Sequence, residues 1–331
     1  MSTDIANTHK PAQKKYFKGS GALQQILAFA SLIILVIFFS IASDNFLHWS
    51  NIEGILLSTT VIGILALGTT FVIITGGIDL SIGTGMTLTS VMTGVFIVYL
   101  GLPLSVGIIG GILSGACIGF ISGFSVSILR IPPFIATLAM MMIAEGLSLV
   151  ISGASPIYFS DVEGFNSIAL GSIIPGISIP NAILVFFFMV LIGWVLLSKT
   201  IVGRYTFAIG SNEEATRLSG INVKKWKLII YTIAGCFTGV AGVIMASRLN
   251  SAQPALGMGY ELEAIAAVVI GGTSLSGGKG SLIGTMIGAL IMSVLTNGLR
   301  IMSIPQEWQT VVIGFVILLA VYFDMLRKKN T

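Results

Sequence analysis

The sequence predicts an all-α polytopic membrane protein with about ten transmembrane helices and both termini in the cytoplasm. The first observation is composition, because 55% of the 331 residues are hydrophobic and only 9% are charged, against about 25% charged residues in an ordinary soluble domain. The second is that apolar residues fall in blocks of about 20, the length that a helix needs to cross a bilayer. The third is a strong bias in the placement of basic residues between these blocks.

Nine blocks are long enough to form spanning helices, and these are 22–42, 52–75, 82–100, 104–128, 133–152, 181–198, 227–248, 280–298 and 307–325. A tenth, shorter block covers 261–275. We therefore expect a cytoplasmic tail over 1–21, one transmembrane domain over 22–325 and a second tail over 326–331. The first block exceeds the ~7–15 apolar residues of a signal peptide, so we expect it to remain as a span, with cleavage as the alternative.

Basic residues support this topology. With the N-terminus inside, fifteen of the 17 Lys and Arg residues face the cytoplasm, and only Arg248 and Arg300 face outward. This distribution follows the positive-inside rule, and the loss of one crossing would invert it for half the chain. The net charge of +4 therefore reflects topology, which argues against nucleic-acid binding.

One predicted span carries a glycine at every fourth residue, at Gly107, Gly111, Gly115, Gly119 and Gly123. Small residues at this spacing let helix backbones approach closely, which favours packing where lipid competes for apolar side chains. We predict a tight helix crossing here, with a loose, mobile helix as the alternative. Cys117 and Cys236 also lie in predicted spans, where we expect them to pack without a disulfide.

Two glycine-rich breaks interrupt the apolar blocks, at Gly76–Gly85 and Gly271–Gly280. They match at six of ten positions, which indicates an internal duplication or a chance similarity. Irregular backbone is tolerated inside a membrane only where protein or a water-filled cavity surrounds it. The pair Gly278-Lys279 does not complete the phosphate-binding loop G-x-x-x-x-G-K-[ST], and His9 and His48 are isolated. We therefore expect no nucleotide, cofactor or metal on this chain.

The cytoplasmic segment 199–226 contains the most informative pattern, a short capped helix. Ser211 and Glu214 have the spacing of a capping box, and Gly220 suits the left-handed position just after a helix end. Two turns of helix are too short to be stable alone in water, so this helix needs a partner. A helix lying on lipid is the alternative, which Glu213 and Glu214 disfavour at a negatively charged leaflet.

Five motifs are specific enough to indicate a family. They are 74–81 (ITGGIDLS), Gly203-Arg204-Tyr205, 211–222 (SNEEATRLSGIN), Ser251-Ala252-Gln253-Pro254 and 259–275 (GYELEAIAAVVIGGTSL). Together they resemble the permease subunits of carbohydrate-uptake ABC importers, most closely the ribose-type permeases, from about Ile52 to Asp324. Ser211 stands where this family often has glycine, and the outer loop 153–180 matches poorly.

The resemblance implies a type II ABC importer permease in a bacterial plasma (inner) membrane. Two permease chains would form the pathway, with ATPase subunits inside and a soluble or lipid-anchored sugar-binding protein outside. ATP and Mg²⁺ would bind the ATPase, so this chain would be a transport subunit with no catalytic residues. The expected solute is a monosaccharide, with ribose first. The implied ATPase-coupling residues are Ser211, Asn212, Glu213, Glu214, Ala215, Thr216, Arg217, Leu218 and Gly220.

Candidates for the solute path are polar groups near span ends or breaks or within spans, because a neutral sugar needs loosely binding hydrogen-bonding groups. They are Asp79, Ser81, Thr137, Glu145, Gln253, Glu261, Glu263 and Asn297. Ionisable groups inside a membrane are functional candidates by default, although Asp79 has the alternative of bonding the amides of its own break. Arg248 and Arg300 are candidates for docking the binding protein by opposite charge, with ordinary interfacial arginines as the alternative.

Other classes of membrane protein fit the sequence less well. An ion-coupled secondary sugar transporter needs ionisable groups near the membrane midplane, where Glu145 is the only fair candidate. A channel would have a ring of charge or a carbonyl filter, and an intramembrane enzyme would need a catalytic or metal constellation; the sequence has neither pattern. An ABC permease for another sugar, a sugar alcohol or a sugar-like signalling molecule stays open, as does a pathway formed with a related, non-identical permease.

Overall fold

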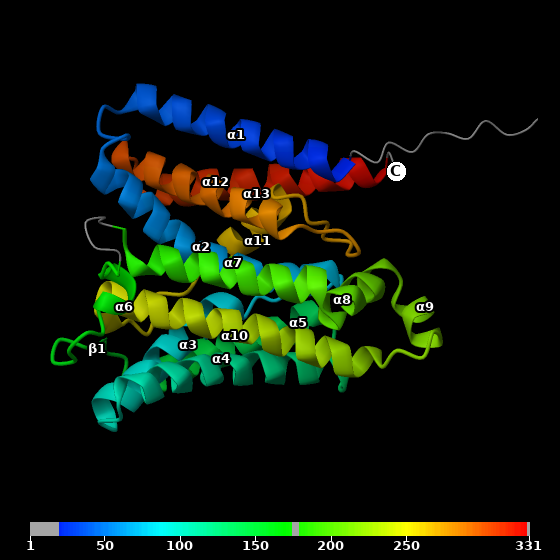
Figure 1. Ribbon diagram of the computed structural model, residues 1–331, viewed down its shortest axis with the longest axis horizontal. Helices are drawn as coiled ribbons and strands as arrows, with labels where there is room; N and C mark the ends of the chain where they lie inside the picture. Colours follow the sequence, from blue (N-terminus) through cyan, green and yellow to red (C-terminus); the bar gives the residue numbers. More distant parts are fainter. Residues whose placement is uncertain (1–19, 174–178, 330–331) are drawn as a thin grey trace, which may run out of the picture.

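A computed structural model describes residues 20–173 and 179–329, and its ribbon is almost entirely helical (Figure 1). Nine helices of this part are long and apolar enough to cross a membrane. They are α1 (Ser20–Ala42), α2 (Trp49–Ile74), α3 (Ile82–Gly94) with its π-helical continuation η1 (Val95–Tyr99), α4 (Leu104–Ser127), α5 (Pro133–Ser152), α7 (Asn181–Lys199), α10 (Val223–Leu249), α12 (Leu282–Ile301) and α13 (Gln306–Lys329). The shorter elements are β1 (Ile157–Tyr158), α6 (Ser167–Leu170), α8 (Ile201–Ser211), α9 (Glu213–Leu218), β2 (Ser251–Ala252) and α11 (Tyr260–Ile270). The predicted all-α membrane fold is confirmed.

The bundle is built around α2, which is almost completely buried, whereas α1 and α13 expose nearly their whole length. Figure 1 shows α1, α12 and α13 along one side and α4 along the other, with α2, α7 and α10 between them. Exposed side chains on the outer helices are large and apolar, for example Ile34, Phe187 and Phe315. Such a surface requires lipid or another membrane protein to cover it.

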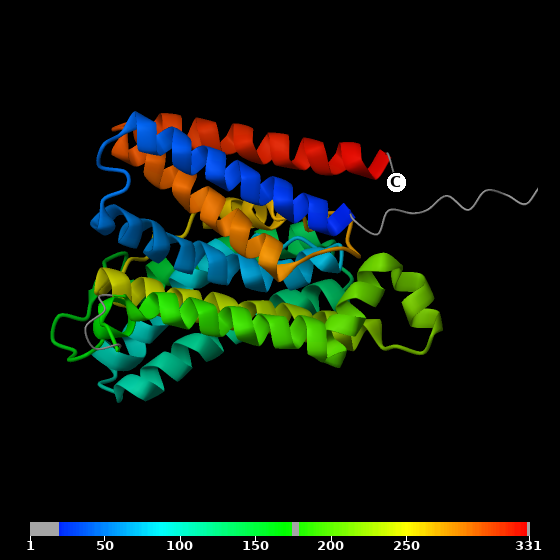
Figure 2. The same cartoon turned by 45° about the horizontal axis from the view of Figure 1, so that its top comes forward.

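Both ends of the described chain, near Ser20 and Lys329, lie at the end of the bundle from which α8 and α9 project (Figures 1 and 2). The β1–β2 pair and α6 lie at the opposite end. The basic residues mark the first end as cytoplasmic. Residues 1–19 of the predicted N-terminal tail lie outside the described part, and α13 continues through 326–329, which were predicted as tail.

The predicted tenth spanning helix at 261–275 is wrong, since α11 has only 11 residues. At 1.5 Å per residue it covers about 16 Å, roughly half of the hydrocarbon core. Its first turn lies beside Arg248 and Arg300 at the outer end, whereas Gly278 donates to the Ile74 carbonyl near the cytoplasmic end (2.8 Å). The chain therefore still crosses a tenth time, partly as helix and partly as glycine-rich irregular backbone.

The two breaks meet at the C-terminal end of α8. The first break, Thr75–Ser81, connects α2 with α3, and the second connects α11 with α12. A β-carbon on Gly210 would lie 1.7 Å from the Ile74 carbonyl oxygen and 2.6 Å from the Gly278 amide nitrogen. Only glycine fits there, and we call Ile74, Gly210 and Gly278 the glycine junction.

The glycine-rich helix α4 packs tightly against α10. A β-carbon on Gly115 would lie 2.5 Å from the carbonyl oxygen of Gly235, and one on Gly119 would lie 2.2 Å from that of Tyr231. The other three glycines of the predicted stripe also have a neighbour closer than 3.0 Å to an added β-carbon, namely Gly107, Gly111 and Gly123. The stripe thus brings α4 into backbone contact with α10, and Gly107 and Gly111 meet side chains of η1 and α3.

We expect Gly115→Ala to lower the melting temperature of the purified permease in detergent, because the added methyl group meets the backbone of α10. Overpacking costs about 1–3 kcal/mol, more than the ~1 kcal/mol that alanine gains over glycine in helix propensity. The matched control is Gly54→Ala in α2, where an added β-carbon has no atom within 4 Å. An unchanged or raised melting temperature for Gly115→Ala would contradict the tight crossing.

Candidate solute pocket and coupling segment

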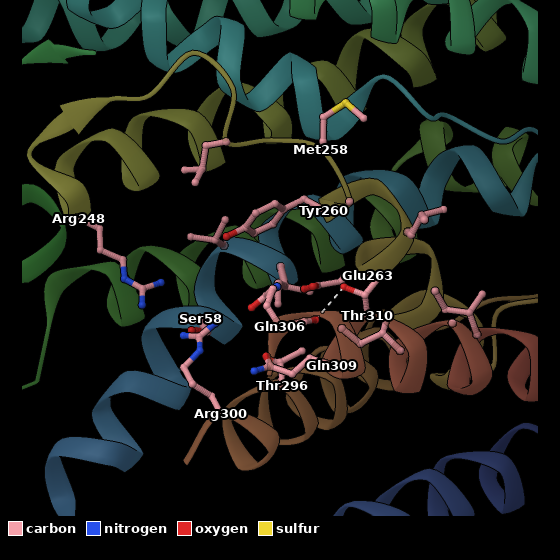
Figure 3. Close-up of a pocket in the computed structure, with 18 residues that line it drawn as sticks. Ser58, Arg248, Met258, Tyr260, Glu263, Thr296, Arg300, Gln306, Gln309 and Thr310 are labelled. Atoms are coloured by element: carbon pink, nitrogen blue, oxygen red, sulfur yellow. Dashed lines mark hydrogen bonds between the residues drawn. The ribbon is translucent and has the colours of Figure 1, made fainter. Parts of the chain in front are cut away.

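A polar pocket opens at the outer end of the bundle, where α2, α10, α11, α12 and α13 come together (Figure 3). Its volume is about 500 Å³, within the range of ~300–1,000 Å³ found for small-molecule sites. Its polar lining consists of Ser58, Arg248, Tyr260, Glu263, Thr296, Arg300, Gln306, Gln309 and Thr310.

Helix ends bring these side chains together. Arg248 and Arg300 lie in the last turns of α10 and α12, Tyr260 and Glu263 in the first turn of α11, and Gln306 at the start of α13. Figure 3 shows the two arginines at one side of the pocket and Glu263 at the other. Residues from distant parts of the sequence therefore converge because the helices end at the same level.

The chemistry of the lining suits a neutral, hydroxyl-rich solute. The arginines only donate hydrogen bonds, the Glu263 carboxyl group can accept them, and the amides and hydroxyls do both. The first turn of α13 is fixed by Gln309 Nε2, which donates to the Ile304 carbonyl (2.7 Å). Among the described residues, no group of three or more His, Cys, Asp or Glu side chains could hold a metal ion.

Three of the residues singled out by sequence meet in this pocket. Glu263 was a solute-path candidate, whereas Arg248 and Arg300 were candidates for docking the binding protein, and all three line the cavity. Sequence reasoning missed Tyr260, Ser58, Thr296, Gln306, Gln309 and Thr310. A signal existed for the last three, because Gln306, Gln309 and Thr310 recur at helical spacing on one face at the start of a predicted span.

Three other candidates stabilise the first break instead of lining the pocket. Asp79 is only 2% exposed, and its Oδ1 accepts hydrogen bonds from the Ser81 amide (2.9 Å) and hydroxyl (2.6 Å). Thr137 donates from its hydroxyl to the Ile78 carbonyl (3.2 Å). Asp79 therefore adopts the alternative that the sequence left open, in which it bonds an amide of its own break.

The remaining solute-path candidates also lie outside the pocket lining. Buried Glu261 accepts from the Gly259 amide (3.1 Å), Gln253 donates to the Ser251 hydroxyl (3.0 Å), and Glu145 is half-buried on α5. Asn297 donates from Nδ2 to Asn51 Oδ1 (3.0 Å), which ties α12 to α2. Glu261, Gln253 and Asn297 have structural partners where they stand.

The cytoplasmic segment folds into α8, α9 and the start of α10. The predicted capping box is wrong, since Ser211 is the last residue of α8 and Asn212 caps α9 by accepting from the Ala215 amide (2.9 Å). Asparagine and serine cap equally well, so the unpredicted α8, which includes Ser211, decides the register. Gly220 has the predicted left-handed conformation (φ +83°).

Two ion pairs organise α9. Glu214 accepts from Arg217 Nε (3.1 Å), and this hydrogen bond lowers the pKa of the Glu214 carboxyl. Glu213 pairs with Lys227 at 2.6 Å and so ties α9 to α10. Leu218 is 76% exposed; a large apolar side chain so exposed beside two ion pairs indicates a surface that a partner covers.

We expect the pocket to contain water, which cysteine labelling can test in a background with Cys117→Ala and Cys236→Ala. Thr310→Cys should react rapidly with a membrane-impermeant thiol reagent, because Thr310 lines the pocket and only an accessible thiolate reacts. Val311→Cys, at the same depth on α13 but outside the lining, should react at least tenfold more slowly. Equal rates would contradict a water-filled pocket.

Nine helices of the described part long enough to span a membrane, two irregular breaks and an outer polar pocket are the features expected of a multi-pass membrane transport protein. The family model described as branched-chain amino acid transport system / permease component matches residues 51–321. The chain therefore belongs to this family of transport permeases. Membership confirms that it is a transport subunit and not an enzyme, as the sequence indicated.

Curated relatives extend the likeness to nearly the whole chain. The ribose import permease of Bacillus subtilis (strain 168) is 45% identical over 319 residues, which are 96% of this chain and 97% of the relative. That of Escherichia coli (strain K12) is 40% identical over 321 residues, 97% and 99% of the two chains. The D-allose transport system permease of Escherichia coli (strain K12) is 37% identical over 301 residues, 91% of each. No solved structure gives a significant match.

Proposed function

We propose that this chain is the membrane-spanning permease subunit of an ATP-driven ABC importer for a monosaccharide, with ribose as the first candidate. The observation that carries the proposal is full-length identity of 40–45% to permeases named for ribose import. Relatives named for xylose and fructose transport are 35% identical, so ribose takes precedence over other sugars.

The cytoplasmic end supplies the coupling contact in this proposal. The helix α9 seats in a groove of the ATPase, with exposed Leu218 as its apolar contact. Shifting a two-state equilibrium from 1:99 to 99:1 needs about 5.5 kcal/mol of differential contact, so α9 must move as a rigid part of the permease. The Asn212 cap and the Glu213–Lys227 pair provide that rigidity.

The outer end receives the solute. In the assembly we propose, a second copy of the chain completes the pathway in a bacterial inner membrane, and a soluble or lipid-anchored binding protein docks outside. The sugar hydroxyls exchange hydrogen bonds with Arg248, Arg300 and Glu263 as the solute enters the pocket. The arginines lie at the outer end of their helices, so acidic groups of the binding protein can also reach them.

The direct test is uptake of radiolabelled ribose into proteoliposomes that contain this chain, its ATPase and its binding protein. We expect uptake that requires both ATP and the binding protein. ATP hydrolysis stimulated by the binding protein without ribose accumulation would reject the sugar but keep the importer. Uptake by this chain alone, driven by an ion gradient, would reject the importer in favour of a secondary transporter.

Coupling can be tested with Gly220→Val, which places a branched side chain at a left-handed position just after α9. The strain is about 1–2 kcal/mol, a factor of roughly 5–30 in the population of the capped helix, and we expect ATP-driven uptake to fall accordingly. The matched control is Gly101→Val at the outer end, since Gly101 is also left-handed (φ +61°) with open space around it. Equal uptake by both variants would contradict the coupling role.

A further inference from the structure

Tyr231 carries a buried polar group that the fold leaves unexplained. It lies in α10, and its side chain is 1% exposed. Its hydroxyl has no hydrogen-bond partner. Only four other buried side-chain polar atoms among the described residues also lack one. Roughly nine in ten buried polar groups are hydrogen-bonded, so an unpartnered phenol points to a function or to a second conformation.

The hydroxyl of Tyr231 lies against the first break. A β-carbon on Gly77 would lie 2.6 Å from the phenol oxygen. Asp79, whose carboxylate is buried, follows Gly77 by two residues in the same break. The same carboxylate already holds the amide and hydroxyl of Ser81, which is the N-cap residue of α3. The phenol is thus an unpartnered donor that lies against the same break as the buried acceptor that fixes the start of α3.

The face of α10 that carries Tyr231 is also linked to α9 by an ion pair. Lys227 precedes Tyr231 by four residues, so both side chains lie on one face of the helix. Lys227 Nζ bonds Glu213 of α9 at 2.6 Å, and its side chain is only 17% exposed. A displacement of α9 therefore reaches Tyr231 through one ion pair and one turn of helix.

The start of the break is held separately. At the glycine junction, Gly278 donates to the Ile74 carbonyl (2.8 Å), and Gly210 of α8 packs directly on both groups. The unit formed by α8, α9 and α10 therefore touches the break at two points, at its beginning and at Gly77. A relative shift between these two points changes the distance from Tyr231 to Asp79.

We propose that Tyr231 is a positioning residue of the transport cycle, whose hydroxyl donates a hydrogen bond to the Asp79 carboxylate in the ATP-bound conformation and lacks a partner in the conformation described here. A ligand shifts a conformational equilibrium only through interactions that differ between the two states, and this bond is such an interaction. Gly77 leaves the path of the phenol open because it has no side chain. The inference rests on the proposed coupling role of α9.

The test compares Tyr231→Phe with Ser293→Ala in the complete complex with ATPase and binding protein. Ser293→Ala is the matched control, because it removes another buried, unpartnered hydroxyl from α12. We expect Tyr231→Phe to lower ribose transported per ATP by about tenfold, because the variant loses one buried hydrogen bond in the ATP-bound conformation. It should also lower the melting temperature of the complex trapped with ATP and vanadate, but not that of the nucleotide-free complex.

A double-mutant cycle with Asp79→Asn identifies the partner. In the trapped complex, the melting-temperature losses of Tyr231→Phe and Asp79→Asn should be non-additive, and in the nucleotide-free complex they should add. Equal losses in both states would assign Tyr231 to folding alone and overturn the proposal, as would unchanged ribose transport per ATP. A wild-type complex that accumulates no ribose would reject the proposed sugar. The difference in melting-temperature loss between the trapped and nucleotide-free complexes would still show whether Tyr231 bonds Asp79.

Discussion

The structure depends on one constraint: inside a bilayer, backbone groups that leave a helix must find partners within the protein. Two irregular breaks, one between α2 and α3 and one between α11 and α12, have their backbone groups surrounded by the rest of the bundle. The Ile74 carbonyl accepts a hydrogen bond from the Gly278 amide, and the Ile78 carbonyl accepts one from the Thr137 hydroxyl. The Asp79 carboxylate accepts one from the Ser81 amide. These bonds form where the breaks lie among packed helices, and α2, directly before the first break, is the most buried of the nine candidate spans in the described part of the chain.

The two breaks and their partners form a layer at the cytoplasmic end of the bundle. Three helices connect this cytoplasmic layer to the outer pocket. The helix α10 carries Lys227 and Tyr231 near its start and Arg248 in its last turn, and its 27 residues extend about 40 Å. The helix α11 begins in the pocket at Tyr260 and ends at the second break, and α12 leaves that break and carries Arg300 in its last turn. At the glycine junction the contacts are between backbone groups and leave little freedom, whereas the pocket is lined by side chains, several of them long. In the transport cycle proposed above, these helices are the elements that would carry a displacement of the layer to the pocket.

Sequence reasoning succeeded where lipid imposes a simple rule and failed where packing decides. Spanning helices follow from apolar length, and the close approach of α4 follows from the spacing of its glycines. The segment 261–275 is apolar enough to be taken for a span, but Gly271 ends α11 halfway. The cap of α9 shifted from Ser211 to Asn212 because both residues can cap and an unforeseen helix includes the first. The pocket was hidden because Arg248, Tyr260 and Arg300 lie apart in sequence, and only the way α13 meets the other helices brings their ends together.

The volume and exposure of the pocket suit a point on a solute pathway better than a tight binding site. At about 500 Å³, it exceeds what one monosaccharide of ten or so heavy atoms fills, so water remains beside the solute and exchanges with its hydroxyls at little cost. Arg300 and Thr310 are exposed, so their hydrogen bonds compete with water. A solute held this loosely can leave again when the bundle changes conformation, because tight binding to one state would itself oppose the change. Full selectivity for one solute is therefore not expected from this pocket alone.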